Sequence, residues 1–98
     1  MSQSKFITHT CTGSPVKLST IMDASGVRLY VGTLAVRAKH TNAGNVYWGG
    51  PSTGVADAGG YLEAGDAVAI DLTNKFFSSD DWYFNGTSND VIYFTMIS

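Results

Sequence analysis

The stretch from residue 61 to residue 74, Tyr-Leu-Glu-Ala-Gly-Asp-Ala-Val-Ala-Ile-Asp-Leu-Thr-Asn, decides the predicted fold. Val68, Ile70 and Leu72 alternate with small or polar residues, which is the period-two pattern of a strand with one buried face. The preceding residues 63–66 predict a tight turn, because Gly65 can adopt the positive φ angle that such turns require. The stretch therefore predicts a turn followed by a core strand, and by itself it indicates no chemistry.

Extended patterns separated by turn residues recur along the rest of the chain. β-branched residues predict a first strand at 5–12, and Val16 and Leu18 share one face of a short second strand that begins at Pro15. Residues 23–26 predict a turn. No segment shows the 3.6-residue apolar spacing of a helix over the length of a helix.

The longest extended segment runs from residue 27 to residue 40. Its apolar residues before and after Gly32 fall on opposite alternations, which predicts a bulge or bend at this glycine. Arg37 and Lys39 then face outward together. We expect residues 34–40 to form a hairpin with residues 45–49 across the turn at 41–44.

The second half of the chain contains two loops and a last predicted hairpin. Residues 50–60 are rich in glycine and form a longer connection than small domains usually contain, so we expect this loop to have a role of its own. Residues 75–81 predict a second, polar loop. Residues 82–84 and 91–97 then predict a hairpin across the connection 85–90.

About eight short strands with turns every eight to twelve residues indicate an all-β fold, an antiparallel β-sandwich or barrel that is jelly-roll-like or Greek-key. The 98 residues make a single domain, 1–98, with residues 1–4 as an N-terminal arm. A chain of this size buries only about two thirds of its unfolded surface, so a partner is well placed to add stability.

The composition points to protein partners. Charged residues make up 14% of the sequence, against roughly 25% in typical soluble proteins, and serine, threonine and eleven glycines replace them. Removing water from such a surface costs little free energy when it contacts another protein. A net charge of −2 without a Lys/Arg cluster argues against a nucleic-acid partner.

Cysteine usage and the ends of the chain indicate a cytosolic product. The single cysteine, Cys11, excludes an intrachain disulfide. No signal-peptide pattern and no apolar run of membrane-spanning length is present, so we expect a soluble chain without a membrane partner.

Candidate metal ligands are few. His9 and Cys11 share one face of the first strand, a spacing that suits two zinc ligands with His40 as a third, but a fourth ligand is not evident. The acidic pair at 80–81 beside Asp90 suits a calcium ion across the last hairpin, although no loop of the EF-hand type is present. The expected metal and cofactor content is none.

Catalytic patterns are absent from the sequence. It contains no Gly-x-Ser-x-Gly elbow and no Gly-Lys-Ser/Thr phosphate loop, and a 98-residue sandwich leaves little room for a cleft between paired carboxylates. No residue can be matched to a catalytic role, so we expect that the protein is not an enzyme.

Two aromatic runs stand out, Tyr47-Trp48 and Trp82-Tyr83-Phe84. Because side chains alternate along a strand, each run should send one residue into the core and its neighbour outward. An outward Tyr or Trp suits stacking on a sugar or anchoring a protein interface. The alternative is that all five only fill a small core.

Two motifs, Gly-Asn-Val-Tyr at 44–47 and Leu-Glu-Ala-Gly-Asp-Ala-Val at 62–68, carry a resemblance that extends over most of the chain. Together with the order of the segments, they resemble small β-sandwich proteins encoded by tailed bacteriophages. Those proteins are virion components, namely capsid decoration or cement proteins, head fibres and similar accessories. This chain departs from the pattern at 47–50, where Tyr-Trp-Gly-Gly replaces the usual Val-Gly end, which leaves open what its aromatic face contacts.

The resemblance implies a non-enzymatic structural protein of a tailed-phage virion, made in the host cytoplasm and located on the capsid surface. Its implied function is capsid decoration or cement between major capsid subunits, with the major capsid protein and further copies of this chain as partners in a homo-oligomer. The alternatives are a carbohydrate- or receptor-binding β-sandwich module and a head-tail or tail accessory ring protein. The expected interface residues are Ser2, Lys5, Tyr47, Trp48, Pro51, Ser52, Thr53, Val55, Phe77 and Trp82.

Overall fold

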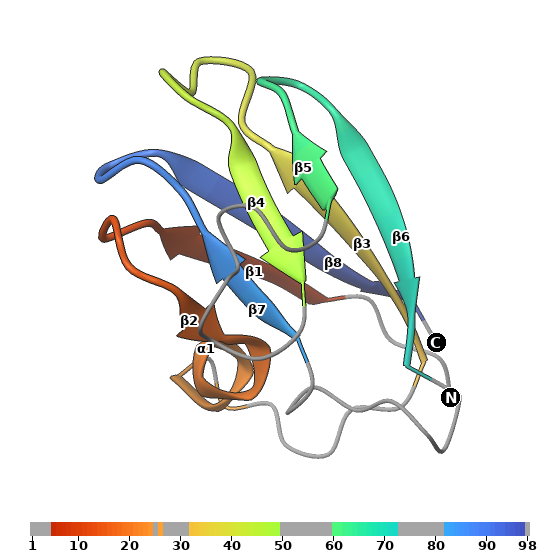
Figure 1. Cartoon of the computed structure of the whole chain (residues 1–98). Coiled ribbons are helices and arrows are strands. Elements are labelled where there is room, and N and C mark those ends of the chain that lie inside the picture. The colour runs from red at the N-terminus through yellow and green to blue at the C-terminus, as the bar shows by residue number, and fades with distance from the viewer. Residues whose placement is uncertain (1–4, 25, 27–31, 50–59, 73–81, 98) are drawn as a thin grey trace.

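The computed structural model describes residues 5–24, 26, 32–49, 60–72 and 82–97 (Figure 1). These residues form two four-stranded antiparallel sheets that pack face to face, so the predicted antiparallel β-sandwich is confirmed. Sheet A contains, in spatial order, β1 (Lys5–Thr10), β8 (Val91–Ile97), β3 (Thr33–Ala38) and β6 (Ala67–Asp71). Sheet B contains β2 (Val16–Lys17), β7 (Tyr83–Asn85), β4 (Val46–Gly49) and β5 (Gly60–Leu62).

The first four strands pair, in reverse order, with the last four. The paired halves of the chain form one long antiparallel ribbon. β1 pairs with β8, β2 with β7, β3 with β6 and β4 with β5, so strands from the two halves of the chain run side by side. The ribbon passes from one sheet to the other between successive strand pairs. The resulting orders, β1-β8-β3-β6 and β2-β7-β4-β5, are those of an eight-stranded jelly roll.

Both predicted hairpins are therefore wrong. β3 and β4 belong to different sheets, and so do β7 and β8, which means that the connections 39–45 and 86–90 cross between the sheets. The turn at 63–66 also crosses between sheets, from β5 to β6. Each sheet must cover the apolar face of the other, and alternation along a strand specifies that face without specifying the neighbouring strand.

The core lies between the two sheets. Phe84 of sheet B and Phe94 of sheet A are almost fully buried and meet edge to face, with ring centroids 5.1 Å apart. On β6 the predicted alternation is confirmed, because Ile70 is buried whereas Ala69 and Asp71 are exposed. The strand pattern that decided the predicted fold therefore places its apolar side against the opposite sheet.

The structure contains a short helix, α1 (Leu18–Ala24), whereas the sequence pattern indicated no helix. Leu18 begins this helix instead of extending β2. Its buried residues Leu18, Ile21 and Met22 are spaced i, i+3 and i+4, so they share one helical face. Seven residues offer too few apolar positions for a helical period to stand out in the sequence. In Figure 1, α1 lies at one end of the sandwich, beside β2.

The turn at 63–66 has the predicted conformation. Gly65 has a φ of 88°, and the amide of Asp66 donates to the carbonyl of Glu63 at 2.9 Å, which together describe a type II turn. The predicted arm 1–4, the loop 50–60 up to residue 59 and the polar loop 75–81 lie outside the described residues. The predicted bend at Gly32 adjoins residues 27–31, which also lie outside them.

Candidate functional site

The outward face of sheet B carries three tyrosines on three adjacent strands. Tyr47 of β4 pairs in register with Tyr61 of β5, and their ring centroids lie 6.4 Å apart. Tyr83 of β7 pairs with Gly49 of β4 and projects from the same face. Tyr61 is 58% exposed, the second most exposed large hydrophobic side chain among the described residues after Phe6. We call Tyr47, Tyr61 and Tyr83 the tyrosine face.

A lysine borders the tyrosine face. Lys17 pairs in register with Tyr83 across β2 and β7, and its Nζ lies 5.9 Å from the centroid of the Tyr83 ring. An ammonium group at this distance is attracted by the negative face of the ring, and this cation–π interaction favours one orientation of the Tyr83 ring. Among the described residues, the face therefore combines broad aromatic area with hydroxyl groups and the positive charge of Lys17.

The two tryptophans point the other way. Trp48 and Trp82 pack against the core and against each other, with ring centroids 5.6 Å apart. Gly60, which pairs with Trp48, leaves the space for its indole, because a Cβ on Gly60 would collide with the ring. The predicted alternation of the two aromatic runs is thus confirmed: Tyr47 and Tyr83 face outward, whereas Trp48, Trp82 and Phe84 face inward.

The expected interface residues divide accordingly. Tyr47 lies on an outward face, Trp48 and Trp82 lie on the core side of sheet B, and Lys5 begins the edge strand β1 of sheet A. The remaining six lie outside the described residues, so their contacts stay predictions. These six are Ser2, Pro51, Ser52, Thr53, Val55 and Phe77.

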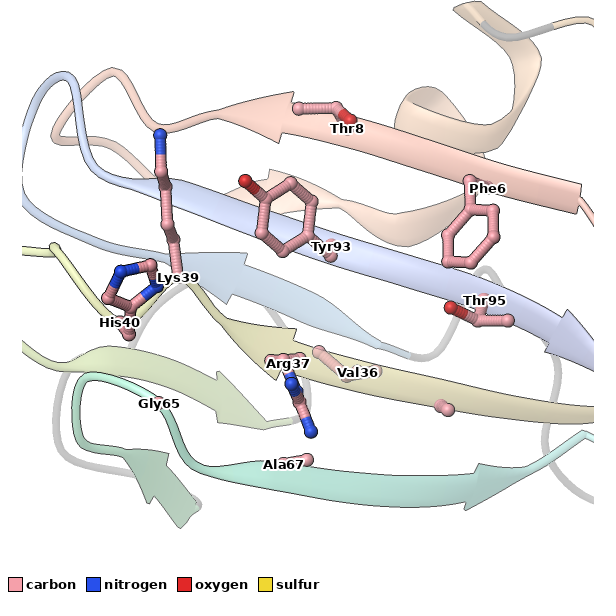
Figure 2. Close-up of a pocket in the computed structure, with 11 residues that line it drawn as sticks. Phe6, Thr8, Val36, Arg37, Lys39, His40, Gly65, Ala67, Tyr93 and Thr95 are labelled. Atoms are coloured by element: carbon pink, nitrogen blue, oxygen red, sulfur yellow. The ribbon is translucent and has the colours of Figure 1, made fainter.

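The outward face of sheet A contains a hollow of about 850 Å³ (Figure 2). It forms because the large side chains of β1 and β8, such as Phe6 and Tyr93, stand beside small residues on β3 and β6, such as Ala35 and Ala67. Phe6 is 74% exposed at one end of this hollow. Thr8 and Thr95, which pair with Tyr93 and Phe6 across β1 and β8, also line it.

Positive charge gathers in this hollow. Arg37 and Lys39 both line it, as the alternation of β3 predicts, and His40 lies at its end beside Gly65. Among the residues that the structure describes as its lining, none is acidic. We call this site the basic hollow, and it contrasts with the net charge of −2 of the whole chain.

The residues whose spacing would suit zinc are not brought together. His9 and Cys11 lie on the core side of sheet A, whereas His40 lies in the basic hollow on its outer side. Burial lowers the pKa of His9, and burial together with the nearby Asp90 raises the pKa of the Cys11 thiol to about 11, which disfavours the thiolate that binds metals. Within the described ranges, no three His, Cys, Asp or Glu residues form a metal-binding group.

Asp90, one of the acids that would suit a calcium ion, has backbone partners within the fold. Its side chain is 7% exposed, and its two carboxylate oxygens accept hydrogen bonds from the amides of Ala43 and Gly44, each at 2.9 Å. The acidic pair at 80–81 lies outside the described residues. Asp90 therefore ties the 39–45 connection to the 86–90 connection.

Sequence reasoning named Tyr47, Trp48 and Trp82 as interface residues without deciding which residue of each run faces outward, and it did not name Tyr61, Tyr83 or Phe6. Alternation within a run indicates only that neighbouring residues face opposite sides. The choice of the outward residue and the grouping on one face require the packing of the two sheets and the strand order β7-β4-β5. The basic hollow was missed for a similar reason. Its floor consists of small residues on β3 and β6, strands whose paired residues lie 30 to 38 positions apart in the sequence.

Within the part of the chain that the structure describes, no helix has the length and apolar character needed to cross a membrane. Neither a protein-family model, a curated protein nor a solved structure was found to match the chain.

Proposed function

We propose that this chain is a non-enzymatic structural protein of a tailed-phage virion. In this role it decorates the outer capsid as a cement protein and stabilises contacts between major capsid subunits. The observation that carries the proposal is the tyrosine face, an aromatic surface on a protein of low charge. The arguments that support this role concern the chemistry of that face, the fold and the number of contacts in a shell.

Tyrosine is well suited to protein contacts. Its ring contributes a large apolar area, its hydroxyl hydrogen-bonds at the rim, and only two side-chain torsions are immobilised on binding. Tyr47 and Tyr61 already constrain each other through their ring contact, so part of this ordering occurs before a partner binds. Such a face supports binding to a protein surface without strong electrostatic attraction.

The fold supports the same class of function. Double-sheet jelly rolls occur in viral capsid proteins and in lectins, although a fold alone does not choose between its functions. The two motifs that resemble tailed-phage accessory proteins, at 44–47 and 62–68, include Tyr47 and the crossing turn before β6. Weak contacts of one small domain become effective when they are repeated many times over a shell.

A carbohydrate- or receptor-binding module is the second candidate. The exposure of Tyr61 favours it, because an exposed phenol ring can stack on the apolar face of a sugar. Tyr47 and Tyr61 are tilted by 50°, however, so the two rings do not share a plane on which one sugar could rest. A head-tail or tail ring protein is the third candidate and would use the same face in a closed ring.

The test is a binding experiment with empty capsids from a phage strain that lacks this chain. We expect the wild-type chain to bind, the double variant Tyr47→Ala/Tyr61→Ala to bind at least about tenfold more weakly, and Tyr61→Phe, which keeps the ring, to bind nearly as well as wild type. Far-UV circular dichroism establishes that each variant is folded.

Other outcomes would contradict the proposal. Absence of capsid binding together with binding on a glycan array would assign the tyrosine face to carbohydrate. Images of the particle separate the remaining rivals, because a decoration protein is present in hundreds of copies whereas a closed ring contains about six or twelve.

A further inference from the structure

We propose that the basic hollow on sheet A is a docking site for an extended acidic segment of a protein partner. This inference does not depend on the proposed function, because it concerns the opposite face of the sandwich and different residues. It rests on the arrangement of Arg37, Lys39, Phe6 and Tyr93 in Figure 2.

The charge of the hollow selects an anionic partner. Arg37 is exposed on β3, Lys39 follows two residues later, and the described lining contains no carboxylate that would neutralise them. Arginine offers a planar fork of donors to a carboxylate and lysine a point charge. In Figure 2 the charged end of Arg37 points toward Ala67 of β6, and that of Lys39 points to the opposite side. The complement of this pair is two carboxylates on the partner.

The spacing of the two cations selects an extended segment. Residues two apart along a strand lie about 6.6 Å apart and point to the same side. An extended peptide with acidic residues at positions i and i+2 has the same backbone repeat. Its two long glutamate side chains can each reach one of the two cations, whose charged ends lie on opposite sides of the β3 backbone. A helical segment would place its i and i+2 side chains on different sides.

The aromatic side chains that line the hollow favour a peptide over a free anion as its ligand. Phe6 and Thr95 lie at one end of the hollow and Tyr93 beside Lys39 near the other, so an extended chain over β3 passes along apolar rings as well as charges. From Ala35 to Lys39 the strand spans roughly 13 Å, which is the length of about four extended peptide residues. A lone phosphate would leave the exposed ring of Phe6 uncovered.

Nucleic acid fits this hollow less well than an acidic peptide. Tight binding to a phosphate backbone requires several cations along its path, whereas the described lining of this site provides two together with one histidine. The rest of the chain is weakly acidic and would repel a longer polyanion. The observations therefore favour a protein segment with local acidic character.

The test uses two blocked synthetic peptides, Thr-Glu-Val-Glu-Thr and its uncharged counterpart Thr-Gln-Val-Gln-Thr, titrated into the full chain at low ionic strength. We expect the glutamate peptide to shift the NMR resonances of Arg37, Tyr93 and Phe6 and to bind at least about fivefold more tightly than the glutamine peptide. Arg37→Gln and Lys39→Gln should each weaken the glutamate peptide about fivefold to tenfold. Lys17→Gln is the matched control, because it removes one positive charge from sheet B on the other side of the sandwich.

The competing outcomes each overturn the inference. Equal binding of the two peptides would remove the role of charge, and equal weakening by Lys17→Gln would show only a general effect of net charge. Inorganic phosphate or a thymidine oligonucleotide that binds more tightly than the glutamate peptide would reassign the hollow to a phosphate ligand. Because Arg37 is exposed, its substitution should leave the thermal unfolding midpoint within about a degree or two of the wild-type value, which establishes that the fold is intact.

Discussion

Gly86 lies so close to the Cys11 thiol that a side chain at this position would collide with it. A Cβ on Gly86 would lie 2.7 Å from Sγ and 3.4 Å from Cβ of Cys11. We expect Gly86→Ala to destabilise the fold by about 1–3 kcal/mol, because the added methyl group overpacks a buried site. Urea denaturation measures this change in the free energy of unfolding.

The double variant Cys11→Ala/Gly86→Ala isolates this contact. Removing the sulfur clears the space for the new methyl group. The double variant should therefore lose less free energy of unfolding than the two single variants lose in sum, by roughly 0.5–2 kcal/mol. Cys11→Ala alone gives the cost of losing the buried thiol. Strict additivity of the two substitutions would show that the strain of Gly86→Ala arises elsewhere.

His9 makes stability depend on pH in a definite direction. Burial lowers its pKa from the usual 6.5, so the unfolded chain binds this proton more readily than the folded chain. Between the lowered pKa and 6.5, the unfolded state carries more protons, and the free energy of unfolding therefore falls as the pH drops through this window. Above 6.5 the imidazole is largely neutral in both states and contributes no slope.

The measurement compares urea denaturation at about pH 7.5 and about pH 5 for wild type and His9→Gln. We expect wild type to lose more stability on acidification than His9→Gln does. His40→Gln is the matched control, since it removes an exposed imidazole from the hollow side of sheet A and should retain the wild-type loss. A His9→Gln variant that loses as much stability as wild type would contradict this assignment.

At the scale of elements, two connections between the sheets depend on one carboxylate. Asp90 holds the amides of Ala43 and Gly44, and next to it Asn42 exchanges two hydrogen bonds with the backbone of Val91, at 2.8 and 2.9 Å. We expect Asp90→Ala to cost about 2–4 kcal/mol, because it leaves two part-buried donors without an acceptor. Thermal unfolding followed by circular dichroism measures the loss.

The control for this prediction is Asp23→Ala. Asp23 is exposed near the C-terminal end of α1, where a negative charge is slightly unfavourable, so its removal should change stability by less than about 0.5 kcal/mol. The stability loss of Asp90→Asn should fall between those of Asp90→Ala and Asp23→Ala. The asparagine oxygen still accepts from one backbone amide, but its NH₂ group faces the other amide, which is also a donor. Equal stability of Asp90→Ala and Asp23→Ala would mean that the connections are held by the other hydrogen bonds.

The elements themselves were predictable wherever one local rule decides them. Alternation along 67–72 located a strand and its buried side, and the Gly65 turn followed from the need for a positive φ. Strand pairing was not predictable, because β1 meets β8 and β3 meets β6 across long stretches of chain. The outward direction of Arg37 followed from alternation, whereas the hollow around it depends on Ala67 and Tyr93, which only the strand order brings beside it.

At the scale of the whole molecule, the tyrosine face and the basic hollow lie on the outer sides of opposite sheets. A domain with two binding faces on opposite sides can bridge two neighbouring subunits, and each contact then raises the effective concentration of the other. The two faces share no residue and lie on opposite sheets, so occupation of one leaves the other accessible. Together, the two proposals therefore describe a bivalent connector.

A bivalent connector should lose most of its affinity for a capsid when either face is impaired. We expect Tyr47→Ala/Tyr61→Ala and Arg37→Gln/Lys39→Gln each to weaken capsid binding by about 10²–10⁴-fold, because only a single weak contact remains. The variant that combines all four substitutions should bind more weakly still, because it also loses the single contact that each pair retains. Binding is measured by co-sedimentation of labelled chain with capsids.

The salt dependence distinguishes the two faces in the same experiment. Raising the ionic strength from about 0.05 M to 0.5 M shortens the Debye length from about 14 Å to about 4 Å, which screens the hollow but hardly affects contacts of tyrosine rings. Wild type and the tyrosine-face variant should therefore lose affinity with salt, whereas Arg37→Gln/Lys39→Gln should bind with little salt dependence. If Arg37→Gln/Lys39→Gln keeps the affinity and the salt dependence of wild type, the chain attaches to capsids through one face only. The bridging role would then be wrong.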